Sequence, residues 1–270
     1  KIMGQNFLID KNTLDNIIKA ADLNKEDIIL EVGPGIGTLT TELAKHTKKV
    51  VTLEKDRAMI EILKETLTSY DNVEIIQGDA LKFNDYSLLT KNYKLVANIP
   101  YYLTSPLIRK FLESKNKPEE IVLMVQKEVA QRICASPPHQ SSKRTYGVGA
   151  SHHKMSLLAV SVQFYAKAKI ISYVSKNCFW PTPKIDSAII KITPSHKNGR
   201  PSVFMGEIEE EKFIKNFFKV VRAGFSQPRK QLSNNLSKAL KINKEKVNNW
   251  LLQNGIDQKQ RAETLSIYDW

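Results

Sequence analysis

The chain has 270 residues, 41% of them hydrophobic, and its 41 lysines and arginines against 28 acidic residues give a formal net charge of +13. This length can bury a substantial core and suits one large domain with a smaller one. The sequence has no apolar run long enough to cross a bilayer, and two cysteines are too few for a disulfide framework. The charge favours a polyanionic partner, with nucleic acid before an anionic membrane surface, although a basic proteome would give the same excess.

The start of the chain lacks the pattern of a signal peptide. Because Cys134 and Cys178 also lie far apart, the sequence predicts a reducing, cytoplasmic setting. Residues 4–8 place two amides beside a glycine and an aromatic, which could clamp a ligand or form a simple N-terminal arm. A helix is predicted over 10–21, with Asp10 capping its start.

A buried strand is predicted over 28–32, followed by a glycine-rich turn and a helix that runs to about residue 45. Strand, glycine turn and helix form the first unit of a nucleotide-binding α/β domain. Gly33, Gly35 and Gly37 have the spacing Gly-x-Gly-x-Gly, which is neither the dinucleotide fingerprint nor a phosphate loop. Glycine lets the backbone approach a ligand closely, and the helix N-terminus offers free N–H groups.

Three further strands are predicted at 50–53, 73–77 and 93–97. The first and the third are each followed directly by a polar residue, and the second is followed by a glycine and then Asp79. Glu54 could accept hydrogen bonds from both hydroxyls of a ribose, and Asp79 could accept the amine of an adenine ring with Ala80 packed beside it. Asn98-Ile99-Pro100-Tyr101 follows the fourth strand as a stiff turn, because Pro100 fixes its own φ and restricts Ile99. Each of these could be an ordinary solvated strand end. Together, at one edge of a parallel sheet, they predict a binding site.

These residues resemble the class I S-adenosylmethionine-dependent methyltransferases and, more narrowly, the ribosomal RNA adenine dimethyltransferases. The resemblance covers nearly the whole chain. It rests on Glu54 and on the blocks 4–8, 31–37, 78–80, 98–101, 125–132, 179–187, 225–232 and 261–266. It implies a Rossmann-like α/β sheet with helices on both faces over residues 1–195, a linker at 196–201, and a small all-helical RNA-binding domain at 202–270.

The resemblance also implies methyl transfer from S-adenosyl-L-methionine to the exocyclic amine of adenine. Asn98 and the main-chain carbonyl of Ile99 would accept the amine hydrogens, Pro100 would hold the turn, and Tyr101 and Phe179 would stack on the base. Core packing remains an alternative for both rings, and Tyr102 is expected to pack in place of Tyr101. The predicted cofactor-binding residues are Gln5, Asn6, Leu8, Gly33, Gly35, Glu54, Lys55, Asp79, Ala80 and Asn98.

One segment departs from the family. Residues 137–154 are rich in Ser, Gly and His and lack an apolar period, which predicts a surface loop. This loop could contact RNA, or its role is unassigned. Three of the five histidines lie there, but no carboxylate or cysteine shares the segment, so no metal site is predicted. The apolar run at 157–163 is expected to be a strand.

The C-terminal part changes to a helical period after Pro201, with Phe213, Phe217 and Val221 on one face. Basic side chains accompany this face, and Arg222, Arg229 and Lys230 are predicted to contact RNA backbone, although charged helices are often simply solvated. The predicted function is dimethylation of two adjacent adenosines near the 3′ end of small-subunit (16S) rRNA by a monomer with a role in subunit biogenesis. A large-subunit methyltransferase of macrolide-type resistance, or a non-catalytic assembly or transcription factor, would be the alternatives.

Overall fold

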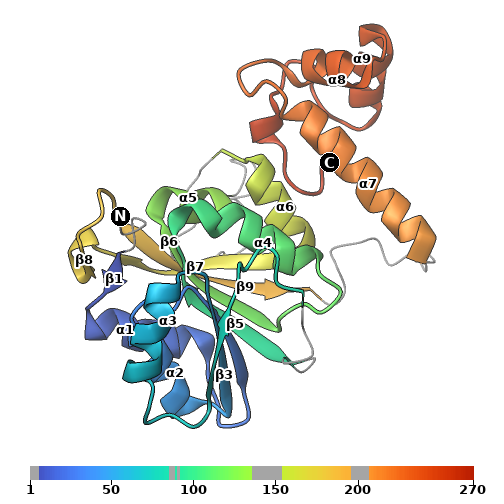
Figure 1. Ribbon diagram of the computed structural model, residues 1–270. Coiled ribbons are helices and arrows are strands. Elements are labelled where there is room, and N and C mark those ends of the chain that lie inside the picture. The colour runs from blue at the N-terminus through green and yellow to red at the C-terminus, as the bar shows by residue number, and fades with distance from the viewer. Residues whose placement is uncertain (1–5, 85–88, 90–91, 136–153, 196–206) are drawn as a thin grey trace. The chain divides into compact units, whose positions relative to one another are not determined.

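The computed structural model describes residues 6–84, 89, 92–135, 154–195 and 207–270 (Figure 1). Contacts divide the chain into two compact units, Lys1–Ala130 with Tyr165–His196 and Gln131–Phe164 with Lys197–Trp270. The grouping of 131–164 with the C-terminal helices differs from the division expected from the sequence. That division concerns domains that fold independently, so it stays a prediction, and its linker at 196–201 lies outside the described residues.

The first unit is built on a seven-stranded sheet with the order β4-β3-β2-β5-β6-β9-β7. Its strands are β2 (Ile28–Val32), β3 (Lys49–Glu54), β4 (Val73–Gln77), β5 (Tyr93–Asn98), β6 (Glu120–Gln126), β7 (Ala166–Val174) and β9 (Ser187–Pro194). The five strands from β4 to β6 are parallel, whereas β9 is antiparallel to both β6 and β7. The predicted Rossmann-like sheet is therefore confirmed.

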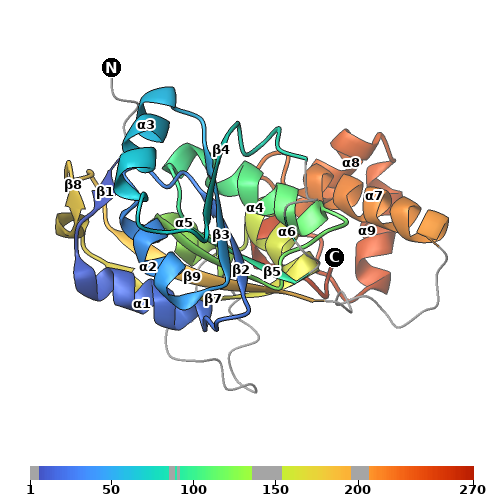
Figure 2. The ribbon, with the colours of Figure 1, turned by 60° about the horizontal axis from the view of Figure 1, so that its bottom comes forward.

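Helices cover both faces of this sheet (Figure 2). They are α1 (Lys11–Ala21), α2 (Thr38–His46), α3 (Arg57–Thr66), α4 (Thr104–Glu113) and α5 (Lys127–Ile133). The predicted cap is present, because Asp10 accepts a hydrogen bond from the Thr13 N–H at 2.8 Å. Leu14, Ile17 and Ala21 are buried as the helical period requires, so α1 closes one face of the core.

A separate two-stranded ribbon joins the start of the chain to a later connection. In it, β1 (Phe7–Leu8) pairs antiparallel with β8 (Phe179–Trp180), so that Leu8 lies opposite Phe179. The ribbon lies in the connection between β7 and β9, next to the 3-10 helix Lys176–Cys178. It therefore brings the N-terminal block to the block that contains Phe179.

The expected strand at 157–163 is wrong, because Leu157–Tyr165 is the α-helix α6. The run is apolar almost throughout, and periodicity alone cannot separate a buried strand from a buried helix in such a run. Packing decides the outcome here. Ala159 and Val160 are fully buried in a cluster with Val221, which holds α6 within the second unit.

The second unit also contains α7 (Glu207–Gly224), α8 (Leu232–Leu240), α9 (Lys244–Gln253) and the 3-10 helix Ala262–Thr264. The predicted helical character is confirmed, and Phe217 stacks on Phe164 with ring centroids 4.5 Å apart. A second cluster around Leu232, Leu236 and Leu251 fills the space between α8 and α9. Among the described residues, no helix combines the length and the apolar character that crossing a membrane requires.

Candidate active site

The candidate site lies at the carboxyl ends of β2, β3, β4 and β5. The chain runs outward from β2 to β3 and β4 and then returns to β5 on the other side of β2. Ligands bind at such a reversal in open α/β sheets, because the two flanking loops diverge there and leave a crevice. All four strands are those that the sequence predicts to end in site residues.

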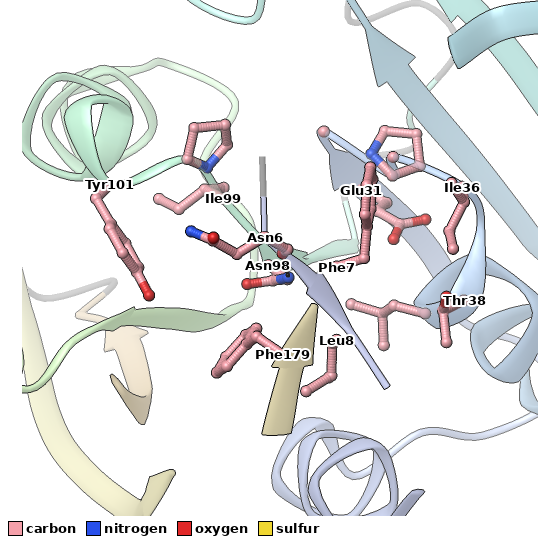
Figure 3. Close-up of a pocket in the computed structure, with 15 residues that line it drawn as sticks. Asn6, Phe7, Leu8, Glu31, Ile36, Thr38, Asn98, Ile99, Tyr101 and Phe179 are labelled. Carbon is pink, nitrogen blue, oxygen red and sulfur yellow. Dashed lines mark hydrogen bonds between the residues drawn. The ribbon is translucent and has the colours of Figure 1, made fainter. Parts of the chain in front are cut away.

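Two adjoining pockets open at this edge. The first, here the Asn98 pocket, is lined by residues that include Asn6, Glu31, Asn98, Tyr101 and Phe179 (Figure 3). The second, here the Glu54 pocket, is lined by residues that include Glu54, Lys55, Asp79, Ala80 and Tyr102. Gly33 and Pro100 line both pockets, so an elongated ligand could extend from one to the other.

The glycine turn forms the wall between β2 and α2. Gly33 and Gly35 have φ angles of +69° and +60°, a region that side chains with a Cβ rarely adopt. A Cβ on Gly35 would also lie 3.1 Å from a ring carbon of Phe7. The Gly33 N–H donates to the Leu53 carbonyl at 3.0 Å, which ties the turn to the end of β3. Both glycines are therefore required by the local backbone, whatever ligand binds.

Glu54 presents a free acceptor to the second pocket. Its side chain is 3% exposed, and its Oε1 accepts hydrogen bonds of 2.8 Å from the N–H groups of Lys55 and Asp56. Its Oε2 is buried and has no hydrogen-bond partner among the described residues. A buried acceptor without a partner carries a desolvation cost that a ligand donor would remove. The arrangement fits a hydroxyl-bearing ligand such as a ribose.

Asp79 also lines the Glu54 pocket. Its Oδ1 accepts from the Leu81 N–H and its Oδ2 pairs with Lys55 Nζ, both at 3.0 Å. The backbone hydrogen bond from Leu81, followed by the Lys55 ammonium, holds the pKa of Asp79 below its usual value. Asp79 is therefore an ionised acceptor at neutral pH, next to a buried Ala80.

Asn98 occupies the centre of the first pocket, with Tyr101 and Phe179 on one side of it (Figure 3). Its Nδ2 donates a long hydrogen bond of 3.5 Å to the Asn6 carbonyl, an assignment that leaves Oδ1 as an acceptor for a ligand. The Tyr101 hydroxyl lies 2.9 Å from Ser187 Oγ at the start of β9, which fixes the ring. An amide oxygen beside two aromatic rings can bind a planar group that carries an amine.

Phe179 belongs to the apolar core and also lines the Asn98 pocket. It is 2% exposed and belongs to the same apolar cluster as Leu8, its partner in the β1–β8 ribbon. It also lines the Asn98 pocket. The stacking and packing interpretations are therefore compatible, because one face of the ring can contact the core while another borders the pocket.

Two residues of the site were missed from the sequence. Glu31, within β2, is 1% exposed and lines the Asn98 pocket, where Thr40 Oγ1 donates to its Oε2 at 2.6 Å. Burial raises the pKa of Glu31 to about 8, against the opposing effect of the Thr40 hydrogen bond, and the Glu54 charge adds to the rise. A glutamate inside an otherwise apolar strand was the available signal.

Tyr102 is the second missed residue, and the expectation that it packs in place of Tyr101 is wrong. Tyr102 is 69% exposed and lines the Glu54 pocket, whereas Tyr101 is half-buried against Ser187. Adjacent aromatic residues in a 3-10 turn, here Tyr101–Leu103, point in different directions, so one ring faces each pocket.

The sequence comparisons agree with this geometry. The family described as Ribosomal RNA adenine dimethylase matches residues 1–270. The chain belongs to this family. Relatives named Ribosomal RNA small subunit methyltransferase A include one from Clostridium botulinum (strain Loch Maree / Type A3), 44% identical over all of this chain and 90% of its own length. Another, from Dehalococcoides mccartyi (strain BAV1), is 41% identical over all of this chain and 85% of its own length.

Solved structures of ribosomal RNA methyltransferases share the fold. A dimethyladenosine transferase from Plasmodium falciparum superimposes with a TM-score of 0.69 and 28% identity over 97% of this chain and 94% of its own. The 23S rRNA methyltransferase ErmE superimposes with a TM-score of 0.72 over 98% of this chain and 96% of its own. Its sequence identity is 23%, so this similarity shows the fold alone. The predicted family, fold class and enzyme class, a ribosomal RNA adenine dimethyltransferase, are thus confirmed.

The remaining predicted residues lie elsewhere. Gln5 and the histidine-rich segment 139–153 fall outside the described residues. Arg222, near the end of α7, and Arg229 and Lys230, between α7 and α8, are all exposed on the second unit, so their RNA contacts stay a prediction. Within the described part of the chain, no group of three or more His, Cys, Asp or Glu is arranged to hold a metal ion.

Proposed function

We propose that this adenine dimethyltransferase uses S-adenosyl-L-methionine to dimethylate N6 of two adjacent adenosines near the 3′ end of small-subunit rRNA, as a cytoplasmic monomer that acts in subunit biogenesis. The observation that carries the proposal is the junction of the two pockets. A pocket suited to a nucleoside opens at Gly33 and Pro100 into one where an amide oxygen lies beside two aromatic rings.

The Glu54 pocket would hold the adenosine part of the methyl donor. Glu54 Oε2 is the acceptor for the ribose hydroxyls, and the Asp79 carboxylate is the acceptor for the adenine amine, with Ala80 beside the ring. The rest of the donor would pass the glycine turn toward Asn98, helped by Asn6 and Leu8. When bound, the donor supplies a methyl group carried on a positively charged sulfur.

The Asn98 pocket would hold the target adenine. The adenine amine is a poor nucleophile, because its lone pair is delocalised into the ring. Asn98 Oδ1 and the Ile99 carbonyl would accept its two hydrogens and thereby favour a more pyramidal nitrogen whose lone pair faces the methyl group. Tyr101 and Phe179 would hold the base by its faces, which requires an unpaired or flipped-out adenosine. A strong base is not needed, since positioning and electrostatic stabilisation supply the rate enhancement.

Small-subunit RNA is favoured over large-subunit RNA by the extent of similarity. The relatives named for the small subunit are 40–44% identical over the whole chain, whereas the 23S enzyme shares 23% identity. The non-catalytic alternative has less support, because Asn98, Pro100 and Tyr101 are intact and converge on one pocket. Arg222, Arg229 and Lys230 would contact the RNA backbone from the second unit, which predicts binding that weakens steeply as salt rises.

The test is incubation of the protein with labelled methyl donor and either unmethylated small subunits or large subunits, followed by mapping of modified bases by primer extension. We expect label on two adjacent adenosines near the 3′ end of the small-subunit RNA. Label confined to the large subunit would replace the proposal with the resistance-type activity, and binding of small subunits without label would favour the assembly role.

A further inference from the structure

The ribbon that carries Phe179 also presents an exposed aromatic residue to solvent. Successive side chains on a strand point to opposite faces. Phe179 accordingly faces the core and the Asn98 pocket at 2% exposure, whereas Trp180 is 67% exposed. A tryptophan this exposed makes little contribution to the core of the unit. It lies one residue from the pocket proposed to hold the target base.

Lysines flank this position on both sides in the sequence. Residues 166–186, from β7 to the start of β9, contain four lysines and one acidic residue, Asp186. Lys127, Lys176 and Lys184 line a shared surface pocket with Glu128, Ile185 and Asp186. Asp186 has a structural task, because its Oδ1 accepts from the Lys176 N–H at 3.1 Å and its carbonyl accepts from the Lys127 N–H at 3.0 Å.

A second exposed aromatic ring borders these lysines. Tyr173, on β7, is 48% exposed, and Lys127 Nζ lies 5.2 Å from its ring centroid. We define the Trp180 surface as Trp180, Tyr173, Lys127, Lys176 and Lys184. Aromatic faces interleaved with ammonium groups are the combination that binds single-stranded nucleic acid, since bases stack on the rings and phosphates pair with the charges. A purely acidic peptide would use the lysines but would not need an exposed indole.

We propose that the Trp180 surface binds the single-stranded RNA that flanks the target adenosine, with the neighbouring base stacked on Trp180 and the backbone passing over Lys176 and Lys184. The inference rests on the proposed function. It adds a substrate contact on the catalytic unit, separate from the basic residues of the helical unit. Stacking on Trp180 would also help to keep the target base unpaired, because the adjacent base is removed from its own stack.

The test compares Trp180→Ala with Trp180→Phe and with a matched control, Ile9→Ala. Ile9 directly follows β1 of the same ribbon and is 59% exposed, so its truncation removes exposed apolar surface without removing an aromatic face. Stacking of one base corresponds to about fivefold to about 150-fold in affinity. We expect Trp180→Ala to raise KM for unmethylated small subunits within that range without a matching fall in kcat, whereas Trp180→Phe and Ile9→Ala stay within about threefold of wild type.

Stacking itself is read out with a synthetic RNA of the two adjacent adenosines in which 2-aminopurine replaces the next nucleotide. Its fluorescence should be quenched by wild type and Trp180→Phe but much less by Trp180→Ala. Equal KM values for Trp180→Ala and Ile9→Ala, or unchanged quenching, would overturn the inference and leave the proposed function standing. Absence of methyl transfer by the wild-type protein would overturn both.

Discussion

The two edges of the parallel sheet differ in whether their buried polar groups have partners within the protein. At the amino edge, the polar groups are matched. Lys94 Nζ, at the start of β5, donates to the Ala21 and Asp22 carbonyls and pairs with Asp27 at 2.8 Å. At the carboxyl edge, Glu54 Oε2 has no partner within the described residues, and the buried Glu31 accepts a hydrogen bond from the Thr40 hydroxyl. The first edge therefore uses these polar groups within the fold, whereas the second leaves a buried acceptor available to a ligand.

Two asparagines at the two edges give the sharpest test of this difference. Asn98 lines the candidate site, whereas Asn72 donates to the Ala44 and Thr47 carbonyls at 2.9 and 3.0 Å. Loss of one preorganised polar group at a reacting centre costs about 100-fold to about 1,000-fold in kcat. We expect Asn98→Ala to lose at least this much methyl transfer while its affinity for the donor, measured by calorimetric titration, stays within about threefold.

Asn72→Ala is the matched control. It should lower the urea midpoint of unfolding and leave kcat near wild type at low temperature, because it removes two hydrogen bonds far from the pockets. An active Asn98→Ala enzyme, or an Asn72→Ala enzyme that is folded but inactive, would contradict the assignment of catalysis to the carboxyl edge and of stability to Asn72.

The next largest effect is expected at the amino edge, from Asp27→Ala. Removing one partner of a buried ion pair costs about 3–5 kcal/mol, and we expect the lower end because Lys94 retains two carbonyl acceptors. The measurement is the free energy of unfolding from urea titration. Lys48→Ala is the comparison, since its pair with Glu26 is exposed and long at 3.4 Å and should contribute at most about 1 kcal/mol. Equal losses in the two variants would show that the buried pair is not a stability element.

The carboxyl edge was largely predictable from the sequence, because three of its strands are short, mostly apolar runs that end in a polar residue and β2 is followed by a glycine-rich turn. That pattern placed Glu54, Asp79 and Asn98 correctly at strand ends, and parallel pairing then brought them to one edge. What the pattern could not give is the surroundings of each ring in a pair. Tyr101 borders the Asn98 pocket with its hydroxyl against Ser187, 86 residues away in the chain, whereas Tyr102, which was expected to pack, is exposed at the Glu54 pocket.

Burial by tertiary neighbours explains the other differences. Leu157–Tyr165 became a helix because Ala159 and Val160 pack in a cluster with Val221, a contact that no local pattern encodes. Glu31 was missed as a site residue because the surroundings of its carboxyl group depend on Thr40, which approaches from α2. Local patterns thus gave the strands and their ends, whereas partners distant in sequence determined burial.

Glu54→Ala should have a smaller effect than the first two predictions, and on binding alone. Hydrogen bonds to a charged group contribute about 1.5–3 kcal/mol, so affinity for the methyl donor or its demethylated product should fall about 10-fold to about 150-fold. Calorimetric titration measures this. The control is Glu74→Ala on the neighbouring strand β4. Its ion pair with the half-buried Lys49 lies outside both pockets, so its loss should leave donor affinity unchanged. Undiminished affinity in Glu54→Ala would return Glu54 to a purely structural role.

The effect that develops most gradually is a change of slope with pH, seen by comparing wild type with Glu31→Gln. Because burial raises the pKa of Glu31 from 4.5 to about 8, the folded protein holds a proton on this group that the unfolded chain has already released between these values. The contribution to stability is complete below about pH 4.5 and is lost as pH rises toward about 8. Glutamine cannot titrate, so the free energy of unfolding of wild type relative to Glu31→Gln should fall across this window.

One proton sets the limit of that slope at about 1.4 kcal/mol per pH unit. Urea unfolding of both proteins between pH 5 and pH 8 gives the difference directly, since every other titrating group is common to both and cancels. Parallel curves would show that Glu31 is ionised in the folded protein. A wild-type curve that falls relative to that of Glu31→Gln would show instead that the carboxyl edge keeps a neutral acid at neutral pH, and this is the feature that separates it most clearly from the paired charges of the amino edge.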